Sequence, residues 1–180
     1  MRFHNITTDD MNNGSGLRTV LWVAGCEHHC AKCHNSITWD ANGGLPFDEV
    51  VEKELFEKAS KDYIEGITFS GGDPLHPQNR EKIGELIEKY ISICPDKNIW
   101  VYTGYRLRDD FSLENENGET FALPYLSKID VLVDGRFECE TRKKDLQEGK
   151  DPDWRGSSNQ RLVDVKNSIK QGEIVLFTNY

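Results

Sequence analysis

Residues 17–35 read LRTVLWVAGCEHHCAKCHN, a run that joins an apolar segment to three closely spaced cysteines. The first part, residues 17–24, is mostly apolar with β-branched residues, as is typical of a buried strand. The second part places Cys26, Cys30 and Cys33 in a C-x3-C-x2-C pattern within eight residues. We therefore expect a buried strand that delivers the chain directly into a cysteine-rich loop.

Three thiolates on one short loop can hold three irons of a cubane [4Fe–4S] cluster. The sequence has no fourth cysteine nearby, so one iron would stay open to a non-protein ligand, could bind a substrate and could pass an electron to it. Two alternatives remain open. The thiolates could form a Cys3His zinc site with His34 or His28, although the side chains of adjacent Cys33 and His34 diverge. They could also form a disulfide or be small buried residues in a reducing cell.

The bulk properties indicate one water-soluble domain covering residues 1–180, long enough to bury a real core. The longest apolar run, residues 20–24, is far too short to cross a bilayer, and no apolar segment follows Arg2 as a secretory signal requires. Five cysteines, three of them clustered, fit a reducing cytoplasm, and Cys94 and Cys139 are isolated. The net charge of −9 argues against general nucleic-acid binding. We expect a cytoplasmic protein that binds neither membrane nor nucleic acid.

Although the net charge is negative, basic residues cluster locally: Arg142, Lys143 and Lys144 are consecutive, and Arg155 and Arg161 follow. A run of charges usually forms a solvated face, and a role in docking a partner is the alternative.

Strand and helix patterns alternate along the chain. Besides residues 17–24, apolar runs predict strands at 64–70, 99–103, 129–133, 161–165 and 173–177. Amphipathic spacing predicts helices at 46–60, which begins with Pro46, and 78–91, which ends at Cys94-Pro95, and a short helix near 167–171. Residues 109–120 predict a surface loop, and 138–160 a long irregular segment or flap.

This alternation predicts an α/β fold with a mostly parallel sheet. Ligands of such folds collect at the carboxyl ends of the strands. A complete (β/α)8 barrel normally needs about 200 residues or more, so we expect a partial, open (β/α) barrel. The carboxyl ends of four predicted strands carry the cysteine loop, Ser70-Gly71-Gly72-Asp73, Thr103-Gly104 and Asp134-Gly135. These segments should meet at one rim.

The segment Ser70-Gly71-Gly72-Asp73-Pro74 is the second candidate site. Its two glycines let the backbone approach a ligand closely, and Asp73 could accept a hydrogen bond from the α-ammonium of an amino acid. Alternatively, Asp73 is the N-cap of a helix with Pro74 at its first position. Thr103 and Asp134 are site candidates by position only, because such residues at strand ends are often turn or cap residues.

Histidines surround the cysteines as well. His34 and Asn35 could contact an adenine ring or orient the loop, whereas His28 and His29 are expected to face solvent or to support the metal ligands from behind. Trp39 is expected to pack.

With both motifs in view, the chain resembles the activating proteins of the anaerobic (class III) ribonucleoside-triphosphate reductases, which belong to the radical S-adenosylmethionine (SAM) superfamily. Besides the cysteine loop, the matching runs cover most of the chain: GLRTVL (16–21), TWD (38–40), TFSGGDPL (68–75), WVYTGY (100–105), IDVLVDGRF (129–137) and RGSSNQR (155–161). The last run separates this group from other radical SAM activases.

Two departures from the superfamily pattern spare the cluster ligands. Lys32 stands before the third cysteine, where an aromatic residue is frequent, so an adenine contact there would use the backbone. The glycine-rich lead-in, residues 13–16, lacks the usual proline.

The resemblance implies a radical SAM fold with two cofactors, a [4Fe–4S] cluster and SAM, and Cys26, Cys30 and Cys33 as the metal ligands. It implies cleavage of SAM to methionine and a 5′-deoxyadenosyl radical, which takes a hydrogen atom from a glycine of the reductase, with a flavodoxin-type protein as electron donor. The turn at Gly71 to Asp73 would hold the methionine part. The implied cofactor-binding residues are Lys32, Cys33, His34, Ser70, Gly71, Gly72, Asp73, Thr103 and Asp134. The alternatives are a radical SAM activase or synthase with another target, which residues 155–161 argue against, and a zinc-stabilised binding module.

Overall fold

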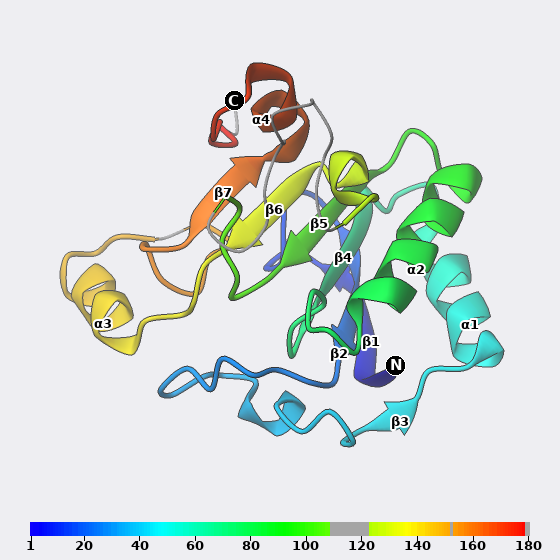
Figure 1. Ribbon diagram of the computed structural model, residues 1–180, viewed down its shortest axis with the longest axis horizontal. Helices are drawn as coiled ribbons and strands as arrows, with labels where there is room; N and C mark the ends of the chain where they lie inside the picture. Colours follow the sequence, from blue (N-terminus) through cyan, green and yellow to red (C-terminus); the bar gives the residue numbers. More distant parts are fainter. Residues whose placement is uncertain (109–122, 152, 179–180) are drawn as a thin grey trace.

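The computed structural model describes residues 1–108, 123–151 and 153–178, and within them seven strands form one sheet (Figure 1). The order across the sheet is β3-β1-β2-β4-β5-β6-β7. The strands are β1 (Arg2–Asp10), β2 (Arg18–Val23), β3 (Leu45–Pro46), β4 (Gly66–Gly71), β5 (Asn98–Tyr102), β6 (Val131–Asp134) and β7 (Arg161–Asp164). Strands β2, β4, β5 and β6 are parallel, whereas β1, β3 and β7 pair antiparallel with their neighbours. The chain is therefore an α/β protein with an open, mixed sheet whose centre is parallel.

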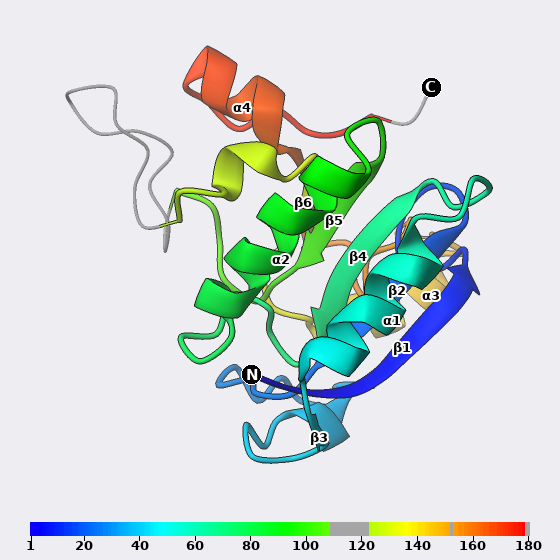
Figure 2. The ribbon, with the colours of Figure 1, turned by 90° about the vertical axis from the view of Figure 1, so that its right-hand side faces the viewer.

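The helices lie unevenly around this sheet. They are α1 (Glu49–Ala59), α2 (Arg80–Ile93), α3 (Cys139–Gln147) and α4 (Val165–Gln171), with short 3-10 turns η1 (Ser36–Thr38) and η2 (Leu126–Lys128). Helices α1 and α2 lie side by side against one face (Figures 1 and 2), and α3 stands apart from the sheet. The opposite face near the carboxyl ends of the parallel strands is therefore left for a site.

The main hydrophobic core lies between the sheet and helices α1 and α2. Successive side chains of a strand point to opposite faces, so every second strand residue enters this core. The sheet supplies Leu21, Val23, Ile67, Phe69, Ile99, Val101, Leu132 and Val163, and the two helices supply Leu55, Phe56, Ala59, Ile83, Leu86, Ile87 and Tyr90. This packing fixes the strands, and with them the loops that follow their carboxyl ends.

Arg18 dominates the amino-terminal half of the opposite face. It is fully buried, and its guanidinium carbon lies 5.3 Å from the ring centroid of Trp100. It donates to Thr68 Oγ1 at 2.6 Å and to Asn98 Oδ1 at 2.6 Å. Burial lowers the pKa of Arg18 to about 10. Residues closer to the carboxyl ends line a cavity instead: Trp22, Ser70 and Tyr102.

The parallel strands and the main helices confirm the sequence patterns. Strands predicted at 17–24, 64–70, 99–103 and 129–133 are β2, β4, β5 and β6, the strand at 161–165 is β7, and the helices at 46–60, 78–91 and 167–171 are α1, α2 and α4. The predicted start of α1 is wrong, because Pro46 belongs to β3 and the N-cap is Asp48, whose side chain accepts hydrogen bonds from the amides of Val50 and Val51. Helix α2 ends at Cys94, as predicted.

Other segments depart from the predictions. Residues 173–177 do not form a strand, and only Val163 and Leu176 form an isolated bridge there. The segment 138–160 contains α3 and is therefore not irregular throughout. Strands β1 and β3 have no counterpart in the sequence patterns, and the predicted loop at 109–120 lies outside the described residues. In the described part of the chain, no helix has the length and apolar character needed to cross a membrane.

Candidate functional site

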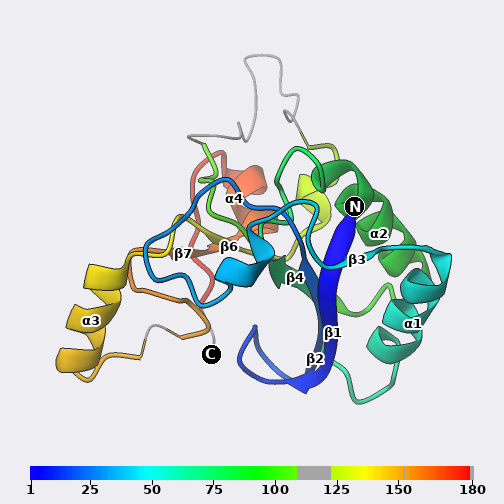
Figure 3. The ribbon, with the colours of Figure 1, turned by 90° about the horizontal axis from the view of Figure 1, so that it is seen from below.

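A cavity of about 650 Å³ lies at the carboxyl ends of the parallel strands. Its lining includes the three clustered cysteines, the turn after β4 and the segment after β5: Cys26, Cys30, Cys33, Ser70, Gly71, Gly72, Asp73, Thr103 and Gly104. Figure 3 shows the cysteine loop and η1 between α3 on one side and α1 and α2 on the other. The two motifs singled out in the sequence therefore line one cavity.

The three cysteine side chains are free thiols, and each is half-buried. Burial raises the pKa of Cys26 to about 11, against the opposing effect of a backbone hydrogen bond from His28. Burial also raises the pKa of Cys30, and a backbone hydrogen bond from Phe137 opposes it. A bound metal deprotonates its thiol ligands outright, and backbone hydrogen bonds to sulfur tune the reduction potential of iron–sulfur clusters. Phe137 thus brings the segment after β6 into contact with the cysteine loop.

The cysteine loop is held at its base by the turn that follows it. The amide of Gly25 donates to Thr38 O at 2.8 Å, and the amide of Cys26 donates to Trp39 O at 3.1 Å. Trp39 packs edge-on against His29, at 4.9 Å between ring centroids, in agreement with its predicted packing role. Lys32 has a φ of 58°, and its side chain is exposed. Among the described residues that line the cavity, Lys32 does not occur.

Asp73 is the most heavily bonded side chain of the site, and it is only 1% exposed. Its Oδ2 lies 2.7 Å from His28 Nε2 and accepts from the amide of Gly104 at 2.9 Å. Its Oδ1 accepts from the Thr103 hydroxyl at 2.9 Å and from the amide of Leu75 at 2.8 Å. A carboxylate offers about four acceptor positions, so protein donors occupy all of them. The Asp73 side chain therefore ties the cysteine loop, the turn after β4 and the end of β5 together.

The structure excludes one of the two sequence alternatives for Asp73 and one of the two for His28. The N-cap of α2 is Asn79, so the interpretation of Asp73 as a helix cap is wrong. His28 is buried and bonded to Asp73, so it does not face solvent, whereas His29 is exposed. Sequence reasoning missed the contribution of Asn79, whose side-chain amide donates to Ala24 O at 2.8 Å and to Asp73 O at 3.0 Å.

The two glycines after β4 allow their turn to touch the base of the cysteine loop. Gly71 has a φ of 106°, which side chains rarely adopt. A Cβ on Gly72 would lie 2.5 Å from Gly25 O, a distance that real Cβ atoms do not reach. The next amide, that of Asp73, donates to the same Gly25 oxygen at 2.7 Å. The glycines are therefore required by packing between the two motifs.

The structure separates the remaining candidates. Thr103 and His34 line the cavity, and His34 packs against Phe137 with ring centroids 5.6 Å apart. Asp134 is fully buried and is not among the described residues that line the cavity. Its carboxylate accepts hydrogen bonds from Arg161 Nε at 2.8 Å and from the amide of Leu107 at 2.9 Å. The contacts of Asp134 join β6 to β7 and hold the segment after β5.

The residues present fit a thiolate-held cluster. Three soft sulfur donors line one cavity, and soft thiolates suit iron–sulfur clusters. Among the described residues, no three His, Cys, Asp or Glu side chains are grouped as ligands of a single metal ion. His28 Nε2 is engaged by Asp73, so only Nδ1 of this ring remains for the Cys3His zinc site considered above.

Comparison with known proteins agrees with this donor set. Residues 12–163 match the family of 4Fe-4S single cluster domains, so the chain contains a domain of this class. A protein of Enterobacteria phage T4 is 42% identical over 162 residues, covering 90% of this chain and 93% of its own. An Escherichia coli (strain K12) protein is 40% identical over 164 residues (89% and 96%), and one of Haemophilus influenzae is 41% identical over 155 residues (84% and 90%).

All three relatives are named anaerobic ribonucleoside-triphosphate reductase-activating protein. With this identity over most of both chains, the chain belongs to the family of these activating proteins. The resemblance noted from the motifs is thereby confirmed, and the match to a 4Fe-4S domain favours an iron–sulfur cluster over zinc.

Proposed function

We propose that this protein is a radical SAM activase that generates a glycyl radical on an anaerobic ribonucleoside-triphosphate reductase. One observation carries the proposal. Three free, half-buried thiols and the glycine-rich turn line the same cavity, at the carboxyl ends of parallel strands. The family to which the chain belongs supports the same activity.

Cys26, Cys30 and Cys33 would hold the [4Fe–4S] cluster. When bound and reduced, the cluster supplies the electron that cleaves SAM to methionine and a 5′-deoxyadenosyl radical, which then takes a hydrogen atom from a glycine Cα of the reductase. The protein places the cofactors and limits the access of water. No side chain of the chain itself needs to act as acid, base or nucleophile.

The turn after β4 would hold the amino-acid end of SAM. Ser70, Gly71 and Gly72 would do so through the hydroxyl and backbone groups that line the cavity. Asp73 and Thr103 would position this turn, because Asp73 is buried and its oxygens are already occupied by protein donors.

The nucleoside would lie near Cys33 and His34, where the His34 ring packs against Phe137. Lys32 would contribute through its backbone, because its exposed side chain is not among the described residues that line the cavity. Asp134 would act at a distance, by holding Arg161 and the segment that follows β5.

The remaining features of the proposal concern architecture and setting. The sheet, with parallel strands at its centre and one face covered by helices, is compatible with a partial (β/α) barrel of the radical SAM type over residues 1–180. A flavodoxin-type protein would supply the electron, and the reduced thiols are suited to the cytoplasm. An open cavity also suits a protein substrate, because the glycine loop of the reductase must reach it.

The test is anaerobic. The protein is reconstituted with iron and sulfide, reduced with dithionite and mixed with SAM, and 5′-deoxyadenosine is measured. A parallel sample with the reductase is examined for a glycyl radical by electron paramagnetic resonance. We expect both products. Cleavage without a radical would leave a radical SAM enzyme with another target, and neither product from cluster-loaded protein would refute the proposal.

A further inference from the structure

One guanidinium in the cavity has a donor without an acceptor. Arg142 lies within the first turns of α3, is half-buried and lines the cavity. Its Nη1 atom is buried and has no hydrogen-bond partner among the residues that the structure describes. A buried donor without a partner costs free energy, so this position is suited to an acceptor that arrives with a ligand.

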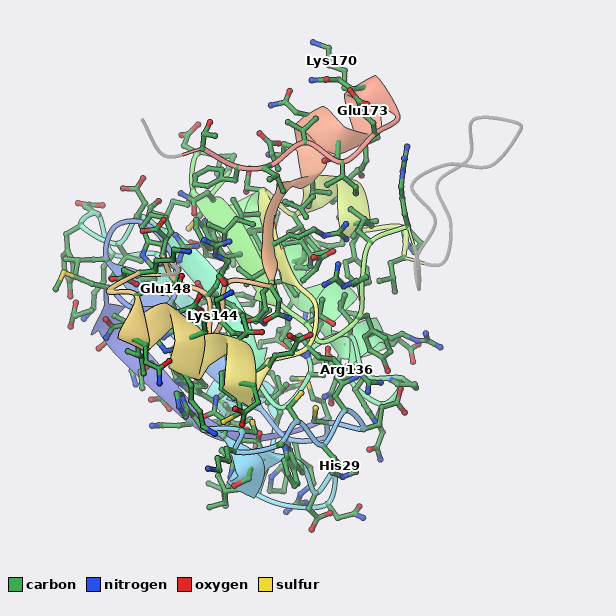
Figure 4. The ribbon with its side chains drawn as sticks, turned by 90° about the vertical axis from the view of Figure 1, so that its left-hand side faces the viewer. His29, Arg136, Lys144, Glu148, Lys170 and Glu173 are labelled. Carbon is green, nitrogen blue, oxygen red and sulfur yellow. The ribbon has the colours of Figure 1, made fainter. Side chains whose placement is uncertain are left out.

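The neighbouring basic residues on α3 differ from Arg142. Lys143 and Lys144 are exposed, with nitrogen-to-oxygen distances of 2.6 Å to Glu140 and 3.9 Å to Glu148. Figure 4 shows Lys144 and Glu148 on this helix. The interpretation of the basic run as a solvated face therefore applies to the two lysines, and Arg142 requires another explanation.

The sequence run 155–161 holds α3 in place. Asp145, which is buried on α3, accepts hydrogen bonds from the amide of Ser158 at 2.9 Å and from its hydroxyl at 2.7 Å. At the start of the helix, the amide of Glu138 donates to the Ser157 hydroxyl at 3.0 Å. The run thus fixes both the beginning and the middle of α3, and with them the direction in which the guanidinium enters the cavity.

The other charged groups in the lining do not satisfy Arg142. Asp151 and Asp153 line the cavity, but no ion pair joins either of them to Arg142 in the described part of the chain. Arg155 also lines the cavity and donates to Gln160 O at 3.2 Å. Arg142 therefore keeps a buried donor that is available to an anion, and it is the only arginine with such a donor in the described part of the chain.

We propose that Arg142 binds the carboxylate at the amino-acid end of SAM, an inference that rests on the function proposed above. At neutral pH that carboxylate is the only anionic group of SAM, whose ammonium and sulfonium groups are positive. A guanidinium matches a carboxylate in charge and in planar geometry, and the pair gains strength in a partly buried site. The carboxylate supplies the acceptor that Nη1 lacks.

The experiment measures binding rather than turnover. Cluster-loaded protein is kept oxidised, and the affinities for SAM and for 5′-methylthioadenosine, which lacks the amino-acid end, are measured by anaerobic equilibrium dialysis. The variants are Arg142→Gln and Arg142→Lys. Lys144→Gln is the matched control, because it removes one positive charge from the same helix at a side chain that is 73% exposed.

We expect Arg142→Gln to weaken SAM binding about 10-fold or more, since a hydrogen bond to a charged group contributes at least about the 1.4 kcal/mol that corresponds to tenfold. Binding of 5′-methylthioadenosine should be unchanged, Arg142→Lys should recover part of the loss, and Lys144→Gln should match the unaltered protein. Unchanged SAM affinity in Arg142→Gln, or an equal loss of affinity for both ligands, would overturn the inference about Arg142 and leave the proposed function standing. Cluster-loaded unaltered protein that binds no SAM would overturn it together with the proposed function.

Discussion

Replacing Asp73 should destabilise the folded protein even when no ligand is bound. Asp73→Ala removes the acceptor of four protein donors: His28 Nε2, the Thr103 hydroxyl, and the amides of Gly104 and Leu75. These donors come from three separate segments of the cavity wall. The variant therefore disconnects the cysteine loop from the end of β5.

The expected loss follows from the burial of these donors. Leu75 is fully buried and His28 is 8% exposed, so both donors would stay largely without water. Each buried donor without a partner costs about 1–3 kcal/mol, whereas water at the cavity edge can replace part of the bond to Gly104. We expect Asp73→Ala to lower the free energy of unfolding by about 3–5 kcal/mol. Domains are typically stable by about 5–15 kcal/mol, so the variant should still fold.

The assay is urea unfolding of the cluster-free protein under reducing conditions, followed by circular dichroism. Thr103→Val is the matched control, since it deletes one donor and leaves Asp73 with three, and it should cost about 1 kcal/mol. A loss below about 1 kcal/mol in Asp73→Ala, together with weaker SAM binding by the cluster-loaded protein, would refute the reasoning. The carboxylate would then act on the ligand.

Three further changes test other parts of the site. Cys30→Ala should abolish cluster binding, measured as iron and sulfide content after reconstitution, and a full iron content would contradict its role as a ligand. Gly72→Ala should cost about 1–3 kcal/mol in urea unfolding, because its Cβ would lie 2.5 Å from Gly25 O; unchanged stability would show that the turn can move. Asp134→Ala should cost about 3–5 kcal/mol by removing the carboxylate that accepts from Arg161 and from the buried amide of Leu107, while SAM affinity per folded molecule is preserved; a specific loss of SAM affinity would place Asp134 in the binding site.

The parallel centre of the sheet was predictable because its strands are short and largely apolar. Residues 20–24 form an unbroken apolar run in which Trp22 alone is partly exposed, and the fully buried residues 67–69 are apolar except for Thr68. Strand β1 lies beyond them and is half-exposed along most of its length, with the polar sequence RFHNITTDD. The extended conformation of β1 depends on its antiparallel pairing with β2, a tertiary contact that no local sequence pattern reveals. The run at 173–177 shows the opposite error, since its apolar residues pack beside β7 through a single bridge.

The candidate site was predictable in its components and less so in their roles. Strand ends identified Asp73, Thr103 and Asp134 equally well, because topology places all three at one rim. Their roles depend on which donors surround each carboxylate, and these donors are distant in sequence. Asp134 is matched to Arg161, and Asp73 to His28. No spacing rule connects such pairs.

The three residues before Cys26 explain why the two motifs behave as one rim. The amide of Gly72 donates to Val23 O at 2.8 Å, the side chain of Asn79 donates to Ala24 O at 2.8 Å, and the amide of Asp73 donates to Gly25 O at 2.7 Å. The parallel pairing of β2 and β4 continues to Val23 and the first glycine of the turn, so these bonds extend the sheet past its last ladder pair. Chemistry between a cluster and a bound cofactor depends on their separation to within about 1 Å. Because the bonds join backbone at the base of the cysteine loop to the glycine-rich turn that lines the cavity, neither segment can shift without the other.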